Sequence, residues 1–324
     1  MPIRRATIDA DDDLTSYLTT LVRLVPVVVA DGSPPAVFAR HAALWPPEIV
    51  HLAVDADRCS DLNGKVAGVV TGLRRVRTAK AVIADDDVRY DAFSLGRIAR
   101  LLDGADVVLP QNVFDPAPWH TVLDGGRTLI ARATGGDWPG TIGLRMRAYH
   151  RAGDYDGDVL FENLELVRTM LVTGASVVRA DDLFVPRRPP TAQRYLQQRV
   201  RQAYDELARP ARMTAQLLVG PALAVAAARF GRPTWPVFAA LSIALAEAGR
   251  RRARGTRAFP LSTAIAAPVW VLERAVTSWV ALGLRVARGG VRYSNGTLRR
   301  AANSERALRA RYRDAGRGVR RAVR

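Results

Sequence analysis

The feature that most restricts the fold is the alternation, in the first half of the chain, of short apolar runs with helix-like stretches. The runs are β-branched and end at turn residues, which is typical of buried strands; they occupy residues 25–30, 49–54, 81–84, 107–110, 141–144 and 176–179. Leu and Ile recur at helical spacing over residues 14–24 and 92–102, and Asp91 is placed to cap the second helix. This order predicts an α/β fold with a mostly parallel, doubly wound sheet.

The charge of +17 is distributed unevenly along the chain. Residues 1–184 contain 20 basic and 25 acidic side chains, whereas residues 185–324 contain 28 and 6. The two halves are therefore expected to have different roles. The single cysteine, Cys59, excludes a disulfide framework and a cysteine-cluster metal site. Residues 1–13 lack the apolar core of a signal peptide, so we expect the first half to be cytoplasmic.

The second half begins with a predicted basic helix over residues 191–209, ended by Pro210. Four uncharged stretches follow it, at residues 213–228, 233–246, 258–272 and 275–284. Each is shorter than the ~20 apolar residues of a membrane-spanning helix. A hairpin that enters near Arg212, turns at residues 229–232 and returns at Arg250 agrees with the positive-inside rule. Glu273 and Arg274 leave open whether the later stretches span a membrane or lie in its interface.

Residues 297–315 predict a basic amphipathic helix near the C-terminus. Its apolar face consists of Leu298, Ala301, Leu308, Tyr312 and Ala315, with arginines around the rest. Such helices favour anionic membrane lipids. The alternatives are a solvated tail and a nucleic-acid contact. Because the sequence has no nucleic-acid motif and no aromatic residues interleaved with the arginines, we expect no nucleic-acid partner.

Three consecutive aspartates follow the apolar run that ends at Ala84. In an extended segment side chains alternate, so Asp85 and Asp87 are expected to point to the same side. Two carboxylates at a strand end suit Mg²⁺ or Mn²⁺, which proteins usually hold by one or two carboxylates together with substrate phosphates. The alternative is that these residues only cap the helix that follows.

Two more polar clusters follow apolar runs. Asp31, with Gly32 and Ser33 after it, could accept hydrogen bonds from a base or a sugar, or form an ordinary turn. Asn63 and Gly64 predict a helix start, and Lys65 beside them could approach a phosphate or remain a surface lysine. Ligands of α/β sheets bind beyond the carboxyl ends of the strands, where these clusters are expected.

The order of these segments resembles family 2 glycosyltransferases. Residues 160–166 (LFENLEL) are similar to the xEDxxL segment of that family, and residues 198–202 (QRVRQ) to the QxxRW motif of its membrane-bound members, including ceramide-glucosyltransferase-like enzymes. The resemblance covers roughly residues 15–205. It implies a GT-A fold, a doubly wound, Rossmann-like mixed sheet, followed here by membrane-associated C-terminal helices.

The resemblance also implies roles for individual residues. Asp85 and Asp87 would hold the metal, and the donor would be bound by Asp31, Lys65, Asp86, Gln198 and Arg201. The family's catalytic aspartate is replaced by Asn163, an amide that cannot take a proton, so Glu162 is the expected base and Glu165 the alternative. Gln202 replaces the family's Trp, which weakens any inference of processive synthesis.

Polar and aromatic residues between the aspartates and the LFENLEL segment are candidates for binding the acceptor. They are Gln111, Trp119, Asp137 and Trp138, and in the family this region faces the sugar and the acceptor. Core packing is the alternative for both tryptophans.

The sequence thus predicts an inverting, metal-dependent transferase that moves a sugar from a nucleotide-diphosphate sugar to a hydroxyl of a lipid-linked or envelope glycan acceptor. We expect it at the inner membrane with its catalytic domain in the cytoplasm. The alternatives are a non-catalytic sugar-nucleotide-binding scaffold and a nucleotidyltransferase. The expected parts are a catalytic domain (1–186), a basic helix completing the site (187–212), membrane-embedded or interfacial helices (213–290) and a basic tail (291–324).

Overall fold

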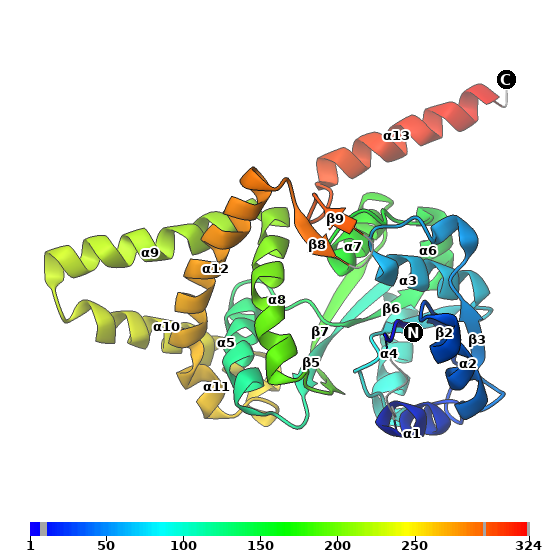
Figure 1. Ribbon diagram of the computed structural model, residues 1–324, viewed down its shortest axis with the longest axis horizontal. Helices are drawn as coiled ribbons and strands as arrows, with labels where there is room; N and C mark the ends of the chain where they lie inside the picture. The colour runs from blue at the N-terminus through cyan, green and yellow to red at the C-terminus, as the bar shows by residue number, and fades with distance from the viewer. Residues whose placement is uncertain (7–11, 294–295, 323–324) are drawn as a thin grey trace. The chain divides into compact units, whose positions relative to one another are not determined.

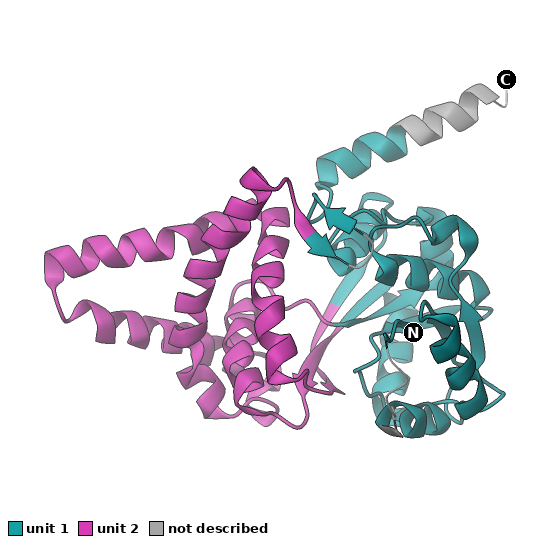
Figure 2. Cartoon of the chain, in the orientation of Figure 1, with its two compact units in different colours: residues 1–109, 140–178, 292–324 teal, residues 110–139, 179–291 magenta. Residues whose placement is uncertain are grey.

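The computed structural model describes residues 1–6, 12–293 and 296–322 of the chain (Figure 1). These residues divide into two compact units, neither of which is one continuous stretch (Figure 2). Unit 1 is formed by residues 1–109, 140–178 and 292–324, and unit 2 by residues 110–139 and 179–291. The compact units therefore cut across the four consecutive parts expected from the sequence.

Unit 1 contains parallel and antiparallel strands. The strands β1 (Pro2–Ile3), β2 (Val28–Asp31) and β3 (Val50–Ala53) form a parallel sheet. In a second sheet, β6 (Thr141–Arg145) runs antiparallel to β4 (Lys80–Ala84) and to the start of β5. β5 (Val107–Phe114) and β7 (Val177–Arg187) begin in unit 1 and end in unit 2. All six predicted strands are present.

Helices connect the strands of unit 1. They are α1 (Asp12–Leu21), α2 (Pro35–Leu44), the short 3₁₀ helix η1 (Ala56–Arg58), α3 (Gly64–Arg75), α4 (Ala92–Gly104), α6 (Met146–Ala152) and α7 (Glu162–Val172). The predicted cap at Asp91 is confirmed: Ser94 N donates to Asp91 Oδ1 at 2.7 Å, and Asp91 N donates to Ser94 Oγ at 3.0 Å. Asn63 caps α3 by accepting a hydrogen bond from Lys65 N at 3.1 Å.

Unit 2 is mainly helical. It contains α5 (Trp119–Ala133), α8 (Ala192–Asp205), η2 (Glu206–Ala208), α9 (Pro210–Phe230), α10 (Thr234–Arg251), η3 (Arg252–Arg257), α11 (Leu261–Ile265) and α12 (Ala267–Ala287). Leu129, Phe259 and Trp270 belong to its core. Gly249 of α10 lies against the Leu129 carbonyl, where a Cβ would come within 1.8 Å of the oxygen, so only glycine allows this contact.

The hairpin predicted to turn at residues 229–232 is present as α9 and α10. Pro210 stands at the first turn of α9, where its missing N–H costs nothing, so it starts a helix rather than only ending one. α12 continues through Glu273 and Arg274, and Arg274 is buried at 1 % exposure.

The predicted helix over residues 297–315 is wrong in its first part. β8 (Val291–Tyr293) and β9 (Gly296–Leu298) come first, and α13 begins only at Glu305 (Glu305–Ala322). Leu298 and Ala301 are buried, and Leu160 N and Phe161 N donate to the carbonyls of Arg300 and Ala301 at 3.0 and 2.7 Å. These contacts with the chain before α7 replace the helical hydrogen bonds. Ala315 lies among the residues whose side chains the structure does not describe.

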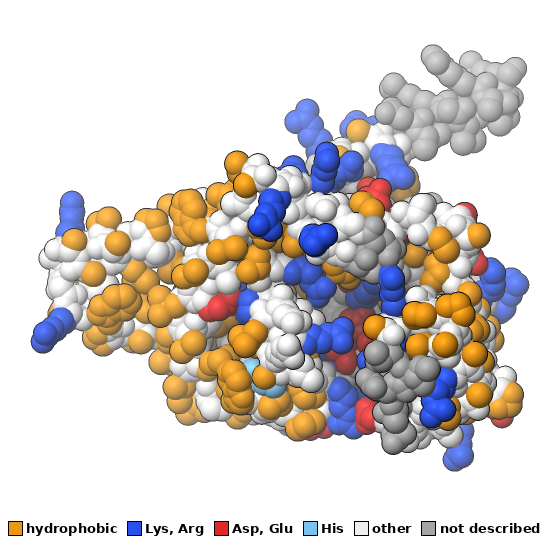
Figure 3. Space-filling model, viewed as in Figure 1, with side chains coloured by type: hydrophobic (Ala, Val, Ile, Leu, Met, Phe, Trp, Pro, Cys, Tyr) orange, Lys and Arg blue, Asp and Glu red, His pale blue; other side chains and the backbone are white. Residues whose placement is uncertain are grey.

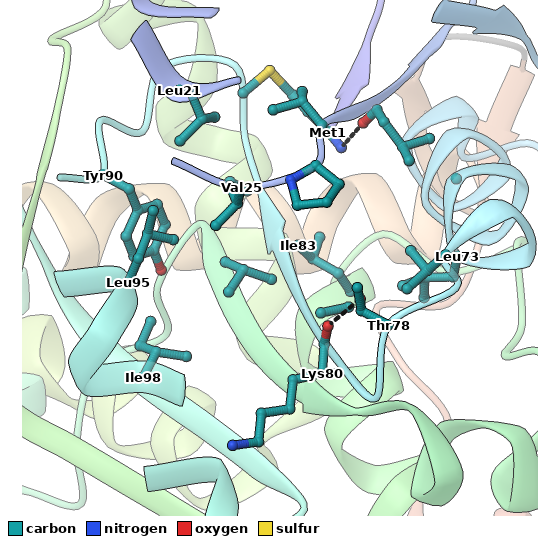
Figure 4. A pocket seen from close by; sticks show the side chains of 18 of the residues that line it. Met1, Leu21, Val25, Leu73, Thr78, Lys80, Ile83, Tyr90, Leu95 and Ile98 are labelled. Carbon is teal, nitrogen blue, oxygen red and sulfur yellow. Dashed lines mark hydrogen bonds between the residues drawn. The ribbon is translucent and has the colours of Figure 1, made fainter. Parts of the chain in front are cut away.

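Unit 1 contains an apolar cavity of about 400 Å³ beside β2, β4 and α3 (Figure 4). Leu21, Val25, Ile83, Leu95 and Ile98 are among the side chains that line it. Gly68 and Gly72, one helical turn apart on α3, also face the cavity. Side chains at these two positions would meet different surroundings.

Gly72→Ala is expected to raise the free energy of unfolding by about 1 kcal/mol, the gain in helix propensity. The new Cβ would lie 3.9 Å from Val28 Cγ1 and 4.0 Å from Ala30 Cβ, which are ordinary contacts. Gly68→Ala is the matched control, because its Cβ would lie only 2.9 Å from Pro2 Cβ. Crowding against Pro2 should cancel the gain in helix propensity for this variant. Urea unfolding followed by circular dichroism measures the free energy of unfolding of both variants. A destabilised Gly72→Ala variant would contradict the expectation that a methyl group fits at residue 72.

Candidate active site

Lys65, Asp85 and Glu162 form an ion triad within unit 1. Lys65 Nζ lies 2.6 Å from Asp85 Oδ1 and 2.6 Å from Glu162 Oε1. The three side chains come from the first turn of α3, the residue that follows β4 and the first residue of α7. Their exposed fractions are 20 %, 20 % and 14 %, so the triad is partly shielded and still reachable from solvent. The sequence predicted a role for each of these residues, and the structure brings them together.

The two carboxylates of the triad strongly favour the charged form of Lys65. Burial alone would lower the pKa of Lys65, but the two carboxylates outweigh it and hold that pKa well above its ordinary value. Lys65 therefore stays charged at neutral pH. Tyr155 is buried nearby, and burial together with the charge of Glu162 raises the pKa of its hydroxyl well above its ordinary value. The N-terminus of α7 adds a favourable dipole for the Glu162 carboxylate.

The aspartates after β4 lie in a turn rather than in an extended segment. Asp85 N donates to Gly140 O at 2.9 Å, and Val88 N donates to Asp85 O at 3.1 Å. The turn closes because the strand pairing with β6 ends at Ala84. The extended segment from which Asp85 and Asp87 were expected to point to one side is therefore not present. Asp86 is paired with Arg5 at 2.7 Å.

Asp85 and Asp87 are the candidate metal ligands of this turn. Their carboxylate oxygens are of the kind that Mg²⁺ and Mn²⁺ prefer, and an ion held by two carboxylates has positions left for phosphates. Asp85 Oδ1 already pairs with the ammonium of Lys65, so a metal ion bound through this oxygen would share it with Lys65.

Asp31, predicted to contact the nucleotide, lies at the end of β2 and is 2 % exposed. Its Oδ2 is 2.7 Å from His41 Nδ1 and 3.1 Å from His51 Nε2, and its Oδ1 accepts from Ser33 N at 2.8 Å. Burial raises the pKa of the Asp31 carboxyl, but the hydrogen bonds from Ser33 and the histidines outweigh this and lower it.

Glu165, the alternative base, is fully buried on α7. Asn303 donates to its carboxylate twice, from the backbone N at 2.7 Å and from Nδ2 at 2.8 Å. Burial raises the pKa of Glu165 despite these bonds. Asn303 Nδ2 also donates to Asp156 at 2.9 Å, and Arg168 donates to the Asn303 carbonyl at 2.8 Å. The residues before α13 thereby fasten α7 within unit 1.

Gln111 and Asp137, two of the predicted acceptor-binding residues, lie together inside unit 2. Asp137 accepts from Arg127 at 2.5 Å and from Thr128 at 3.1 Å, and its pKa is lowered because Arg127 outweighs the effect of burial. Gln111 accepts from Arg132 at 3.0 Å, and both residues of that pair are 2 % exposed or less. In this arrangement both predicted residues have structural partners.

The predicted tryptophans differ in their surroundings. Trp119, the first residue of α5, is 62 % exposed, which is the exposure expected of a stacking surface. Trp138 is half-buried, with the Arg179 guanidinium 5.5 Å from its ring centroid.

The QxxR segment lies on α8. Gln198 and Arg201 are half-buried, whereas Arg199 between them is buried. Arg199 lies 2.7 Å from Asp124 Oδ1 and 2.8 Å from Glu273 Oε2, and so links α8 to α5 and α12. Arg199 was not among the predicted site residues, although its place on the apolar face of a basic helix was a usable signal.

The comparisons with known proteins support the fold. No family model matches the sequence, and no curated protein matches it. The chain is similar to a solved structure of the mannosyltransferase PcManGT from Pyrobaculum calidifontis, in complex with GDP-Man and Mn²⁺. This match covers 86 % of this chain and 86 % of the mannosyltransferase, at 16 % identity and a TM-score of 0.52. The mannosyl-3-phosphoglycerate synthase of Rubrobacter xylanophilus covers 62 % of this chain and 72 % of its own, at 12 % identity and a TM-score of 0.39. The match to the mannosyltransferase structure gives the chain a mixed α/β, GT-A-like fold, as predicted.

Proposed function

We propose that the protein is an inverting, metal-dependent glycosyltransferase that uses a nucleotide-diphosphate sugar. The observation that carries the proposal is the ion triad, which joins a candidate metal ligand (Asp85) and a candidate base (Glu162) through Lys65 at the end of β4. The GT-A-like fold supports it, because ligands of such sheets bind beyond the carboxyl ends of the strands.

In this mechanism Glu162 takes the proton of an acceptor hydroxyl, whose oxygen attacks the sugar C1 as the nucleoside diphosphate leaves. Lys65 contacts both Glu162 and Asp85 at 2.6 Å and so holds the Glu162 carboxylate beside Asp85. A divalent ion held by Asp85 and Asp87 would neutralise charge that develops on the diphosphate. Glu165 is not the base in this proposal, because its carboxylate is buried and bonded to Asn303.

The donor class can be tested by thermal shift with GDP, UDP, CDP and ADP, each with and without Mn²⁺. GDP is tried first because the similar mannosyltransferase was solved with GDP-Man and Mn²⁺. A diphosphate at 100 times its Kd is expected to stabilise the protein by about 2.7 kcal/mol, a shift of several degrees. The shift should require Mn²⁺ and disappear in Asp87→Asn.

Asp103→Asn is the matched control, because Asp103 is an exposed aspartate paired with Lys80 outside the triad. It should keep the full shift. A folded protein that no diphosphate stabilises would favour the non-catalytic scaffold. A thermal shift that survives in Asp87→Asn would show that Asp87 does not hold the metal ion.

We further propose that the α9–α10 hairpin inserts into an anionic membrane and brings the enzyme to a lipid-linked or envelope acceptor at the inner membrane. Among the described residues, one helix, α9, is long and apolar enough to cross a membrane, with a mean hydropathy of 1.4. Apolar side chains cover the hairpin and basic ones stand at its end (Figure 3). Leu218, Phe230 and Leu241 are each more than half exposed. Water is a poor environment for such a surface.

Vesicle flotation tests the hairpin. Leu218→Asp is expected to lower partitioning into vesicles containing phosphatidylglycerol about 100-fold, because a charge in the hydrocarbon costs ~3 kcal/mol. Leu196→Asp on α8 is the matched control, since Leu196 is similarly exposed at 61 % but lies outside the hairpin. Equal loss in both variants, or in neither, would contradict insertion through α9.

A further inference from the structure

Two of the four histidines of the chain converge on one buried carboxylate in unit 1. Asp31 ends β2, His41 lies on α2 and His51 lies on β3, so three separate elements contribute to the cluster. The side chains of Asp31, His41 and His51 are 0 %, 8 % and 9 % exposed. Buried polar groups from three elements meet only where the fold holds them, which distinguishes this cluster from a chance surface contact.

Hydrogen bonds, rather than a cationic side chain, stabilise the Asp31 carboxylate. Within the described part of the chain its partners are the two imidazoles and Ser33, and no Lys or Arg forms an ion pair with it. A buried carboxylate is costly unless a cation or several hydrogen bonds stabilise it. The ion triad, by contrast, has Lys65 as its cation. A metal ion at the Asp31 cluster would add the positive charge that no Lys or Arg brings to it.

The donor atoms are close to the arrangement that a metal ion requires. Asp31 Oδ2, His41 Nδ1 and His51 Nε2 all lie within 4.8 Å of one another, with oxygen–nitrogen distances of 2.7 and 3.1 Å. Ligands held ~2.0–2.1 Å from a tetrahedral Zn²⁺ are about 3.3 Å apart. To admit the ion, the 2.7 Å contact would have to lengthen by about 0.6 Å and the 3.1 Å contact by about 0.2 Å.

Aromatic packing fixes both imidazole rings. His41 stacks on Trp45 with ring centroids 4.5 Å apart and an interplanar angle of 8°. His51 stacks on Phe38 at 4.1 Å and 19°. Rings held in this way present their nitrogens to Asp31 without a further loss of side-chain freedom. Such preorganisation favours binding of an ion by this set of ligands.

We propose that Asp31, His41 and His51 form a second metal site, which binds Zn²⁺ or a similar transition-metal ion and ties α2 to β2 and β3. Imidazole nitrogens select such ions, whereas the carboxylates of Asp85 and Asp87 suit Mg²⁺ or Mn²⁺. The two sites therefore differ in chemistry and in residues. With three protein ligands, the ion's fourth position is left to a water molecule.

The test is calorimetric titration of the chelator-treated full chain with ZnCl₂, followed by measurement of bound zinc by mass spectrometry. One Zn²⁺ per chain is expected, with a rise in Tm. His51→Asn should weaken the affinity at least 10-fold, whereas Asp87→Asn and His150→Asn, an exposed histidine, should leave it unchanged. Replacement by Co²⁺ should give the visible absorption of a site with nitrogen ligands, a readout on the unaltered chain that does not depend on a variant folding.

Two results would overturn the proposal. One is the absence of stoichiometric Zn²⁺ on the folded wild-type chain. The other is zinc binding that His51→Asn keeps or that Asp87→Asn abolishes. In either case the hydrogen bonds of Asp31 with Ser33, His41 and His51 would be its stabilising contacts without a metal ion. Sugar transfer and diphosphate binding are measured separately, so the proposed function can fail or hold independently of this site.

Discussion

Glu162→Gln is expected to lower kcat for sugar transfer about 1000-fold, within the range that a general base contributes. The amide cannot accept the acceptor's proton, yet it has nearly the same shape and can still accept a hydrogen bond from Lys65, which lies 2.6 Å from the carboxylate. Donor binding should therefore be retained, and KM for the donor should change little. Initial rates with a radiolabelled donor, together with the thermal shift by diphosphate and Mn²⁺, measure both effects.

Glu165→Gln is the matched control on the same helix. Its carboxylate is buried and accepts two hydrogen bonds from Asn303, so this variant should lose stability rather than chemistry. We expect a lower Tm and a kcat within a few-fold of the wild type at a temperature where the variant is folded. Full activity in Glu162→Gln, or a 1000-fold loss confined to Glu165→Gln, would reverse the assignment of the base.

Much of the fold could be predicted because its signals are local. Strand positions follow from β-branched apolar runs, and the start of α4 follows from Asp91, whose cap depends on residues within one turn. The helix predicted from residue 297 failed for a non-local reason. Leu298 and Ala301 satisfy the helical pattern, but the backbone beside them pairs with residues 160 and 161, more than a hundred positions earlier. A single-sequence periodicity contains no information about that partner.

Only part of the candidate site was predictable, because its residues lie in local motifs whereas their contacts are non-local. Motif order indicated Lys65, Asp85 and Glu162 individually, but not that one ammonium would contact both carboxylates. The turn at Asp85 depends on a hydrogen bond that Asp85 N donates to the Gly140 carbonyl, which no pattern near residue 85 reveals. The histidines around Asp31 were missed because they lie 10 and 20 residues from it, outside the spacings of known metal motifs.

Asp124→Asn is expected to lower the free energy of unfolding of unit 2 by about 3–5 kcal/mol, the cost of breaking a buried ion pair. Asp124 is 3 % exposed and lies 2.7 Å from Arg199 Nη1 and 3.3 Å from Arg127 Nε. The amide would leave the buried Arg199 and the half-buried Arg127 without this counter-charge. Urea unfolding should show the loss, and Asp103→Asn, an exposed partner of Lys80, should change stability by at most about 1 kcal/mol.

The pH dependence separates lost charge from lost packing at Asp124. Burial alone would raise the pKa of this carboxyl, but Arg127 and Arg199 outweigh it and lower the pKa from 3.8 to about 2. Because the folded-state pKa lies below the unfolded one, the stabilisation is present above pH 4 and is lost as the pH falls toward 2. The difference in the free energy of unfolding between the wild type and Asp124→Asn should therefore narrow by about 2 kcal/mol over this range. A difference that does not change with pH would mean that Asp124→Asn destabilises the protein by altering packing, and that the charge of Asp124 contributes little to stability.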